Sequence, residues 1–249
     1  MGTRLDNATR LYMEGIRDGD ISAIDRYTGD RYTQHSTGVP DGQEGFKAFF
    51  RDFLERNPKR DIRIVRGWED GEYVFVQAYQ SLNDGEFEYV TTDFFHTDAQ
   101  GRIIEHWDVI SELGGPGAID GATAITDLHA TEANKRVVQD MLRGCLFPSA
   151  RAERIADWVA EDIVQHNPDV PDGRAAFAAF AQDADRPLVY DDIVLCAGRG
   201  NFVATMSRAR LSDQPLCWMD IFRLEDGRVV EHWDNSEPAG TSTVNGGKF

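Results

Sequence analysis

Apolar residues recur at helical spacing in one stretch near the start of the chain. Five of them fall at i, i+3, i+4, i+7 and i+8 and so share one helix face: Phe46, Phe49, Phe50, Phe53 and Leu54. Asp41 precedes this stripe with Glu44 three residues later, a spacing typical of a helix N-terminus. Further helices are expected over Leu5–Arg17, Ile21–Tyr27, Asn134–Leu146 and Arg151–Val159. We expect the phenylalanine stripe to serve as core first and as cavity wall second.

Alternating apolar and polar positions predict strands after each group of helices. A short strand is expected to end at the Gln-His pair of each half, 34–35 and 165–166. In the first half, long strands are predicted over Asp61–Gly67, Glu72–Leu82, Phe87–Thr97 and Arg102–Ser111. In the second half they are predicted over Leu188–Ala197, Phe202–Leu211, Leu216–Leu224 and Arg228–Ser236. Helices followed by an antiparallel meander indicate the α+β class, with a curved sheet wrapped round the helices.

The two halves repeat each other. The segment QHSTGVPDGQEGFKAFF (34–50) aligns without a gap on QHNPDVPDGRAAFAAFA (165–181). Further on, DFFHTDAQGRIIEHWD (93–108) matches DIFRLEDGRVVEHWD (220–234), with one residue fewer in the turn. Two motifs in the same order at nearly the same separation indicate a duplication. We therefore expect a first domain over 1–113 and a second over 132–238, joined by a Gly- and Ala-rich linker over 114–131. The tail 239–249 is expected either to be loose or to fold back over a pocket mouth.

The repeated Glu-His-Trp-Asp segment places ionisable groups in a strand. Because side chains alternate between the faces of a sheet, His106 and Asp108 share one face and Glu105 and Trp107 share the other. Asp93, on the preceding strand, can join His106 and Asp108. Periodicity alone leaves open which of the two faces is turned inward.

The same segment gives little support for a metal site. A catalytic zinc ion usually needs three protein ligands, and His-x-Asp offers two with no third at a helical or hairpin spacing. We expect neither a metal nor a cofactor.

Charge excludes several kinds of partner. The net charge of −17 disfavours binding to nucleic acid, which depends on neutralising phosphates with Lys and Arg, and it disfavours docking on anionic lipid. No apolar run approaches the length of a membrane span, and the N-terminus lacks a secretory apolar core. The three cysteines are odd in number and have no Cys-x-x-Cys spacing, which favours thiols in a reducing compartment. We expect a cytoplasmic protein.

These motifs resemble the nuclear transport factor 2-like superfamily, and within it the SnoaL-like polyketide cyclases and aldol-condensation proteins. The Gln-His-Asn-Pro, Pro-Asp-Gly and Glu-His-Trp-Asp segments carry the resemblance, which covers about residues 5–112 and 132–236. It implies two tandem cone-shaped domains, each a curved, mostly antiparallel sheet wrapped round about three helices, with a pocket inside. The substrate stays open, because this fold hosts many activities.

The resemblance also assigns roles to residues of both copies. It implies that Asp108 and Asp234 point inward, where SnoaL-like cyclases carry an acid/base aspartate. Three further kinds of position match ketosteroid isomerases of this fold: the catalytic base, the protonated oxyanion-donor aspartate and the oxyanion tyrosine. They correspond to His35 and His166, to Asp93 and Asp220, and to Tyr12. The second copy lacks a counterpart of Tyr12.

Acid–base chemistry needs a base and a donor for a developing enolate oxygen. Imidazole titrates near neutral pH, so His35 could act as the base, unless it only caps the neighbouring turn. Burial would raise the pKa of Asp93 and keep it protonated as a donor, whereas a nearby imidazole, His35 or His106, would hold Asp108 ionised. His232 is the equivalent of His106 in the second copy. The expected substrate-binding residues are aromatic: Phe46, Phe50, Trp68, Phe95, Phe177 and Phe222.

Three classes of function remain. The first is a cofactor-independent cyclase, aldol-type lyase, dehydratase or isomerase acting on a mostly apolar carbonyl compound. The second is a hydrolase that activates water, such as an epoxide hydrolase, and the third is a non-catalytic binder of small molecules. We expect a small-molecule substrate, no nucleic-acid or membrane partner, and an intramolecular pseudo-dimer or a homodimer. We also expect the chemistry to lie mainly in the first copy.

Overall fold

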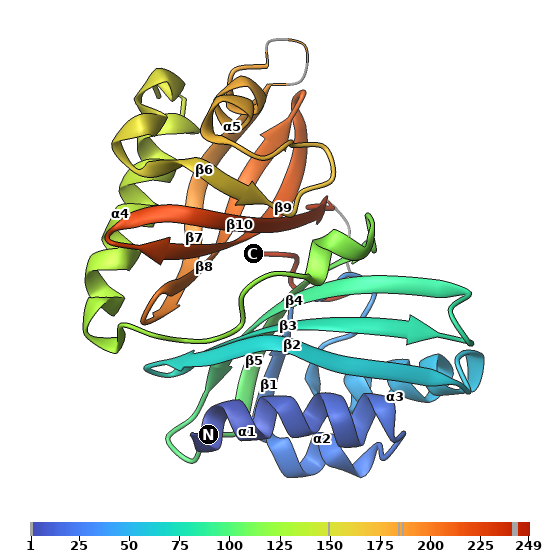
Figure 1. Cartoon of the computed structure of the whole chain (residues 1–249). Coiled ribbons are helices and arrows are strands. Elements are labelled where there is room, and N and C mark those ends of the chain that lie inside the picture. Colours follow the sequence, from blue (N-terminus) through green and yellow to red (C-terminus); the bar gives the residue numbers. More distant parts are fainter. Residues whose placement is uncertain (1, 149, 184, 186, 241–243) are drawn as a thin grey trace. The chain divides into compact units, whose positions relative to one another are not determined.

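The computed structural model describes residues 2–148, 150–183, 185, 187–240 and 244–249. The chain forms two compact units, one of Met1–Leu113 with Gly240–Phe249 and the other of Gly114–Ala239 (Figure 1). The predicted linker therefore belongs to the second unit, and the predicted tail belongs to the first from Gly240 onward. Each unit contains helices and one five-stranded sheet, which confirms the predicted α+β class and the duplicated domain.

The first unit has the sheet order β1-β5-β4-β3-β2. Its strands are β1 (Thr28–Gln34), β2 (Arg60–Asp70), β3 (Tyr73–Leu82), β4 (Phe87–Thr97) and β5 (Ile103–Glu112). Its helices are α1 (Thr3–Arg10), the π-helix η1 (Leu11–Arg17), α2 (Ser22–Tyr27) and α3 (Gly42–Arg56). All strand pairs are antiparallel except β1 with β5, which is parallel. The helices α1, α2 and α3 lie on one side of the sheet (Figure 1).

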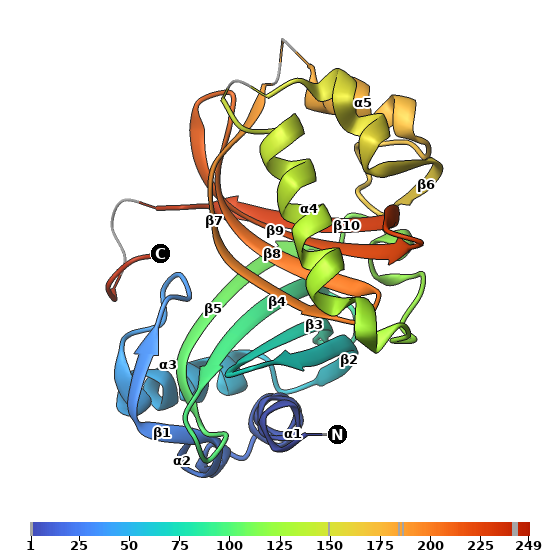
Figure 2. The same cartoon turned by 90° about the vertical axis from the view of Figure 1, so that its left-hand side faces the viewer.

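The second unit repeats this plan with the order β6-β10-β9-β8-β7. Its strands are β6 (Val159–Gln165), β7 (Leu188–Arg199), β8 (Phe202–Leu211), β9 (Gln214–Glu225) and β10 (Arg228–Pro238). Its α-helices are α4 (Thr131–Cys145) and α5 (Arg174–Ala181), and its 3-10 helices are η2 (Pro116–Ile119), η3 (Leu128–Ala130) and η4 (Ala152–Asp157). Figure 2 shows α4 lying along the strands of this sheet.

The apolar stripe of α3 packs into the core of the first unit as its spacing predicts. Phe46 and Phe50 are buried, and they join a cluster that includes Leu11 of η1 and Val76 of β3. The counterpart of this stripe in the second unit is α5, of which Phe177 is buried. In each unit the core thus lies between the helices and one face of the sheet.

Three local expectations need correction. Residues Arg151–Val159 do not form an α-helix: the segment is the short 3-10 helix η4, and Val159 already begins β6. Asp41 stands at the N-cap position of α3 but makes no side-chain cap bond; its Oδ1 accepts a hydrogen bond from the Gln34 backbone N–H at 2.7 Å. The helix predicted over Leu5–Arg17 changes to π-helical geometry at Leu11.

The start of α3 generates a test of close packing. A Cβ at Gly45 would lie 2.6 Å from the carbonyl oxygen of Pro40, so no side chain fits there. We expect Gly45→Ala to lower the free energy of unfolding of the first unit by about 1–3 kcal/mol, because the clash outweighs the roughly 1 kcal/mol gained in helix propensity. Urea denaturation of the whole chain measures this. Gly117→Ala, where no atom lies within 4 Å of the added methyl, is the matched control; equal stability of the two variants would contradict the prediction.

Candidate active site

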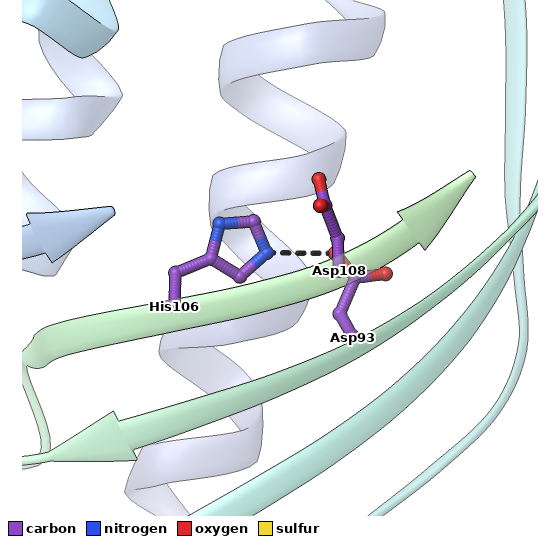
Figure 3. Close-up of side chains that lie close together, drawn as sticks. All are labelled: Asp93, His106 and Asp108. Carbon is purple, nitrogen blue, oxygen red and sulfur yellow. Dashed lines mark hydrogen bonds and ion pairs between the residues drawn. The ribbon is translucent and has the colours of Figure 1, made fainter. Parts of the chain in front are cut away.

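A cluster of titratable side chains lies on the inner face of the first sheet. Asp93 comes from β4, and His106 and Asp108 come from β5 (Figure 3). The register pairs Asp93 directly with Asp108, and alternation puts His106 on the same face as Asp108. His106 and Asp108 line a cavity together with side chains of η1 and α3. This decides the orientation that periodicity left open: these two residues face the helices, and Trp107 faces the other way.

Asp93 is fully buried and has partners at both carboxyl oxygens. His106 Nε2 lies 2.8 Å from Oδ1, and the Tyr12 hydroxyl donates to Oδ2 at 2.7 Å. Tyr12 lies in the first turn of the π-helix η1, and its hydroxyl is also 3.1 Å from Thr91 Oγ1. π-Helical segments occur frequently at functional sites. The structure thus brings Tyr12, Asp93 and His106 into one chain of contacts, as the resemblance implies for Tyr12 and Asp93.

His106 is held on its other sides as well. Its ring stacks on Phe95 at 4.5 Å between centroids. Its Nδ1 lies 3.4 Å from the hydroxyl of Tyr32, which in turn accepts a hydrogen bond from Gln34 Nε2 at 3.0 Å. The imidazole is therefore fixed in orientation by β1, β4 and the neighbouring aromatic ring.

Asp108 is also buried, and its partner is a lysine. Lys248, the penultimate residue of the chain, places Nζ 3.1 Å from Asp108 Oδ1. The Ser36 hydroxyl is a further hydrogen-bond partner of this carboxylate. Nothing in the sequence pattern singled out Lys248, because it lies 140 positions from Asp108 in a Gly-rich tail.

The pKa values of the two carboxyl groups are shifted in opposite directions. Burial raises the pKa of Asp93, and the contacts with His106 and Tyr12 only partly offset this. Burial would raise the pKa of Asp108 too, but the charges of Lys248 and His106 outweigh it and lower that pKa below its usual value. Burial and the neighbouring Asp93 raise the pKa of Tyr12 well above its usual value, so its hydroxyl stays protonated. Such divergent environments separate acid from base in enzymes.

An open cavity of about 640 Å³, counting its mouth, reaches this cluster. Its walls are mostly apolar, and the three titratable residues at its surface are Tyr12, His106 and Asp108. The apolar lining consists of Leu11, Ile16, Val39, Phe46, Phe49, Phe50, Phe53, Phe95 and Ile110. Gln34, Ser36, Thr37 and Gln80 supply further polar atoms.

Of the expected substrate-binding residues in the first unit, some line the cavity and one lies on the back of the sheet. Phe46, Phe50 and Phe95 line the first cavity. The expectation for Trp68 needs correction: it pairs across the sheet with Phe75, which pairs with Phe94 and so shares the face of Trp107. The physical reason is a β-bulge between Ile64 and Arg66, which reverses the alternation of β2. In the second unit, the rings of Phe177 and Phe222 both stack on His232.

His35 also lies outside this cluster. Gln34 pairs with His106 and lines the cavity, so its neighbour His35 turns to the opposite face. There its ring stacks on Trp107 at 4.9 Å, and its nitrogens contact Glu105 Oε1 at 3.0 Å and the Gly247 carbonyl oxygen at 2.7 Å. The placement of His35 as a base inside the cavity is therefore corrected.

His166 repeats this arrangement in the second unit. It stacks on Trp233 at 4.6 Å and contacts Glu231 Oε1 at 2.9 Å and the Gly117 carbonyl oxygen at 2.7 Å. Burial opposes ionisation of Glu231, but His166 and Arg223 lower its pKa to about 2. His166 thus lies on the back of the second sheet, like His35, so its expected place inside the inner cavity is corrected too.

The inner cluster of the second unit consists of Asp220, His232 and Asp234. His232 Nε2 lies 3.1 Å from Asp220 Oδ1, and Asn167 Nδ2 donates to Asp234 Oδ2 at 2.9 Å. Burial raises the pKa of Asp234 to about 6. This unit has a tyrosine donor after all, because the hydroxyl of Tyr190 on β7 donates to Asp220 at 3.0 Å. Sequence alignment missed it because a strand residue here takes the role of a helix residue.

Both clusters offer three groups that could bind a metal. The donor atoms of Asp93, His106 and Asp108 lie within 4.8 Å of one another, as do those of Asp220, His232 and Asp234. The fold thus supplies a third donor group, which the spacing of residues in the sequence did not offer. In the first unit, however, the ammonium group of Lys248 already supplies the positive charge beside Asp108, so this donor set fits a divalent cation poorly.

Comparison with known proteins decides the family. The family model of the SnoaL-like domain matches residues 9–106 and 138–232, once in each unit. The chain belongs to the SnoaL-like family. The tandem duplication predicted from the sequence repeat is confirmed by this double match. No curated protein matches the chain.

Solved structures similar to a SnoaL-like unit include a candidate polyketide cyclase from Bacillus cereus. It is 20% identical, with a TM-score of 0.40, and the match covers 44% of this chain and 74% of that one. A candidate polyketide cyclase from Acidithiobacillus ferrooxidans is 20% identical with a TM-score of 0.40, covering 44% and 89%. A candidate ketosteroid isomerase from Kribbella flavida is 22% identical with a TM-score of 0.37, and the match covers 45% of this chain and 84% of that one.

Among the described residues, no helix is both long and apolar enough to cross a membrane.

The raised pKa of Asp234 predicts how stability depends on pH. Between about pH 4 and 6 the native state holds a proton on Asp234 that the unfolded chain has lost, so this residue makes stability fall as pH rises through that window. We expect Asp234→Asn to be more stable than the wild type by about 1–3 kcal/mol at pH 7.5 and equally stable at pH 4. Urea denaturation across this range measures the difference. The exposed Asp192→Asn is the control; curves for Asp234→Asn and wild type that stay parallel from pH 4 to 8 would contradict the assignment.

Proposed function

We propose that the first unit is a cofactor-independent acid–base enzyme, an isomerase or a cyclase/aldol-type lyase, acting on a mostly apolar carbonyl compound. One observation carries the proposal: a buried carboxylate, Asp108, is held ionised at the wall of an apolar cavity, next to a tyrosine hydroxyl that stays protonated. Membership of the SnoaL-like family supports an enzyme-like domain without naming the substrate.

Asp108 is the proposed base. Its carboxylate is reached from the cavity, and the surrounding phenylalanine side chains keep water away from a bound substrate. Removing a proton from the carbon next to a carbonyl needs a base that is ionised at working pH, and the lowered pKa of Asp108 beside Lys248 and His106 meets this condition.

Tyr12 is the proposed donor to the developing enolate oxygen. Its hydroxyl lines the cavity and shares a hydrogen bond with Asp93. Because burial raises the pKa of Asp93, that carboxyl group can carry a proton itself; the hydrogen bond with Tyr12 then reverses its direction, and the carboxyl group donates to the tyrosine oxygen. The Tyr12 proton is then available to the substrate oxygen, and such a preorganised donor stabilises the charge that develops in the transition state. His106 keeps Asp93 in place through its 2.8 Å contact.

The shape of the cavity favours a compact apolar substrate. Four phenylalanines of α3 and Phe95 of β4 form its walls, and Gln34 and Gln80 offer polar contacts. An aromatic or alicyclic ketone fits this chemistry better than a charged metabolite, because few polar groups face the space and Asp108 repels anions.

The first unit is favoured over the second by the cavity that reaches its carboxylate. Asp108 and Tyr12 both line this apolar cavity, and Lys248 beside Asp108 keeps its carboxylate ionised over the working pH range. The pKa of Asp234 is raised by burial to about 6, so its carboxylate loses its charge below that pH. The second unit is therefore proposed as scaffold or as a different site.

Proton abstraction can be measured without the natural substrate. In D₂O the wild type should accelerate exchange of the α-hydrogens of a bicyclic aromatic ketone such as 2-tetralone, followed by NMR. We expect Asp108→Asn to lower the enzyme-catalysed rate by about 10²–10⁴-fold, because the carboxylate that accepts the proton is gone.

Asp234→Asn is the matched change in the second unit and should retain most of the exchange rate. Two outcomes would overturn the proposal. If Asp234→Asn abolishes exchange while Asp108→Asn does not, the wrong unit has been chosen. If both variants exchange at the wild-type rate, neither aspartate is the base.

A further inference from the structure

The last residues of the chain are built into the first unit. Asn245 Nδ2 donates to the backbone oxygens of Ser36 and Val39, each at 2.9 Å. The Gly247 carbonyl oxygen lies 2.7 Å from His35 Nδ1, and Lys248 Nζ lies 3.1 Å from Asp108 Oδ1. Backbone and side chain thus tie residues 245–248 to the loop after β1 and to β5.

Burial shows that the lysine contact is a specific one. The Lys248 side chain has a relative exposure of 0%, and that of Asp108 is 7%. Burying an ammonium group costs free energy unless an opposite charge lies beside it. Without such a partner, we would expect the lysine of a chain terminus to stay in solvent. Lys248 and Asp108 therefore depend on each other for their burial.

The second unit provides an internal comparison. There the Gly117 carbonyl oxygen lies 2.7 Å from His166 Nδ1, the same contact that Gly247 makes with His35. The residue after Gly117 is Ala118, whereas the residue after Gly247 is Lys248. Asp234, the counterpart of Asp108, has Asn167 as its partner. The same kind of segment thus meets both histidines, but only the C-terminal one brings a positive charge.

We propose that the C-terminal segment 244–249 is a working part of the site in the first unit, with Lys248 as the positioning residue that fixes the Asp108 carboxylate. The proposal rests on the function assigned above to that site. It makes the first unit dependent on residues that follow the second SnoaL-like domain in the chain.

Besides Lys248, the described residues that interact electrostatically with Asp108 include His106, Asp93 and two tyrosines. His106 lies on the same strand, Asp93 is the cross-strand partner on β4, and the hydroxyls of Tyr12 and Tyr32 come from η1 and β1. Asp93 and the two tyrosines carry no positive charge, and His106 is already bound to Asp93 at 2.8 Å. Lys248 is therefore the group that balances a negative charge on Asp108.

The test is a titration of Asp108 that needs no turnover. In the full-length chain labelled with ¹³C at aspartate carboxyls, the Asp108 signal is assigned by its loss in Asp108→Asn. We expect Lys248→Met to raise the Asp108 pKa by about 1–3 units, because an opposite charge at this distance lowers a carboxyl pKa by that amount. Deletion of residues 247–249 should give the same shift, and Lys248→Arg should restore a value near that of the wild type.

Lys59→Met is the control, since Lys59 pairs with Asp84 on the surface, where both side chains are more than 60% exposed. It should leave the Asp108 titration unchanged, and the Asp234 signal of the second unit should not move in any of these variants. An Asp108 pKa that stays at the wild-type value in Lys248→Met overturns the proposal. A shifted pKa together with no α-hydrogen exchange in the wild type would instead uphold the role of Lys248 and reject the proposed enzyme function.

Discussion

Two carboxyl groups that face each other across neighbouring strands set the main constraint on this structure. Asp93 and Asp108 are direct cross-strand partners on the inner face of the first sheet, away from water. Like charges in that position repel, and both would lose their hydration. Each carboxyl therefore needs its own compensation: Tyr12 and His106 for Asp93, and Lys248 with Ser36 for Asp108. The π-helix, the parallel edge strand and the C-terminal segment all contribute to this one requirement.

The duplicated SnoaL-like domain meets the same constraint twice with different residues. Asp220 and Asp234 are again cross-strand partners. Here the tyrosine donor comes from strand β7 in place of the opening helix, and an asparagine takes the position beside Asp234. A neutral partner cannot balance a second charge, so burial raises the pKa of this aspartate to about 6. The two halves thus keep the geometry of the cluster and differ in its electrostatics.

Local pattern accounts for much of the fold and for part of the site. The helical stripe ending at Leu54, the strand alternation around His106 and the repeat itself predict the element order and the inner position of Asp93 and Asp108 once the orientation of the sheet is known. Trp68 escapes such reasoning because a β-bulge reverses the faces of its strand. The position of His35 could not be predicted in this way, because the face to which each side chain of β1 points depends on the register of β1 with β5.

Contacts between segments that lie far apart in the sequence could not be predicted from the local sequence pattern. Lys248 stands in a Gly-rich tail with no periodicity, and its burial depends on a carboxylate 140 residues away. Tyr190 lies on a strand, whereas Tyr12 lies on a helix, so an alignment of the two copies cannot pair them. Both residues became visible only through their partners in space.

The assignment of the C-terminal segment to the first unit has a consequence for how the protein is made. During synthesis domains generally form in order from the N-terminus. The strands of the first unit emerge early, yet the ion partner of Asp108 emerges only after the second unit has been translated. Until then a newly formed first unit must keep that aspartate protonated or hydrated. The half of the protein that is translated first is thus the half whose interior is completed last.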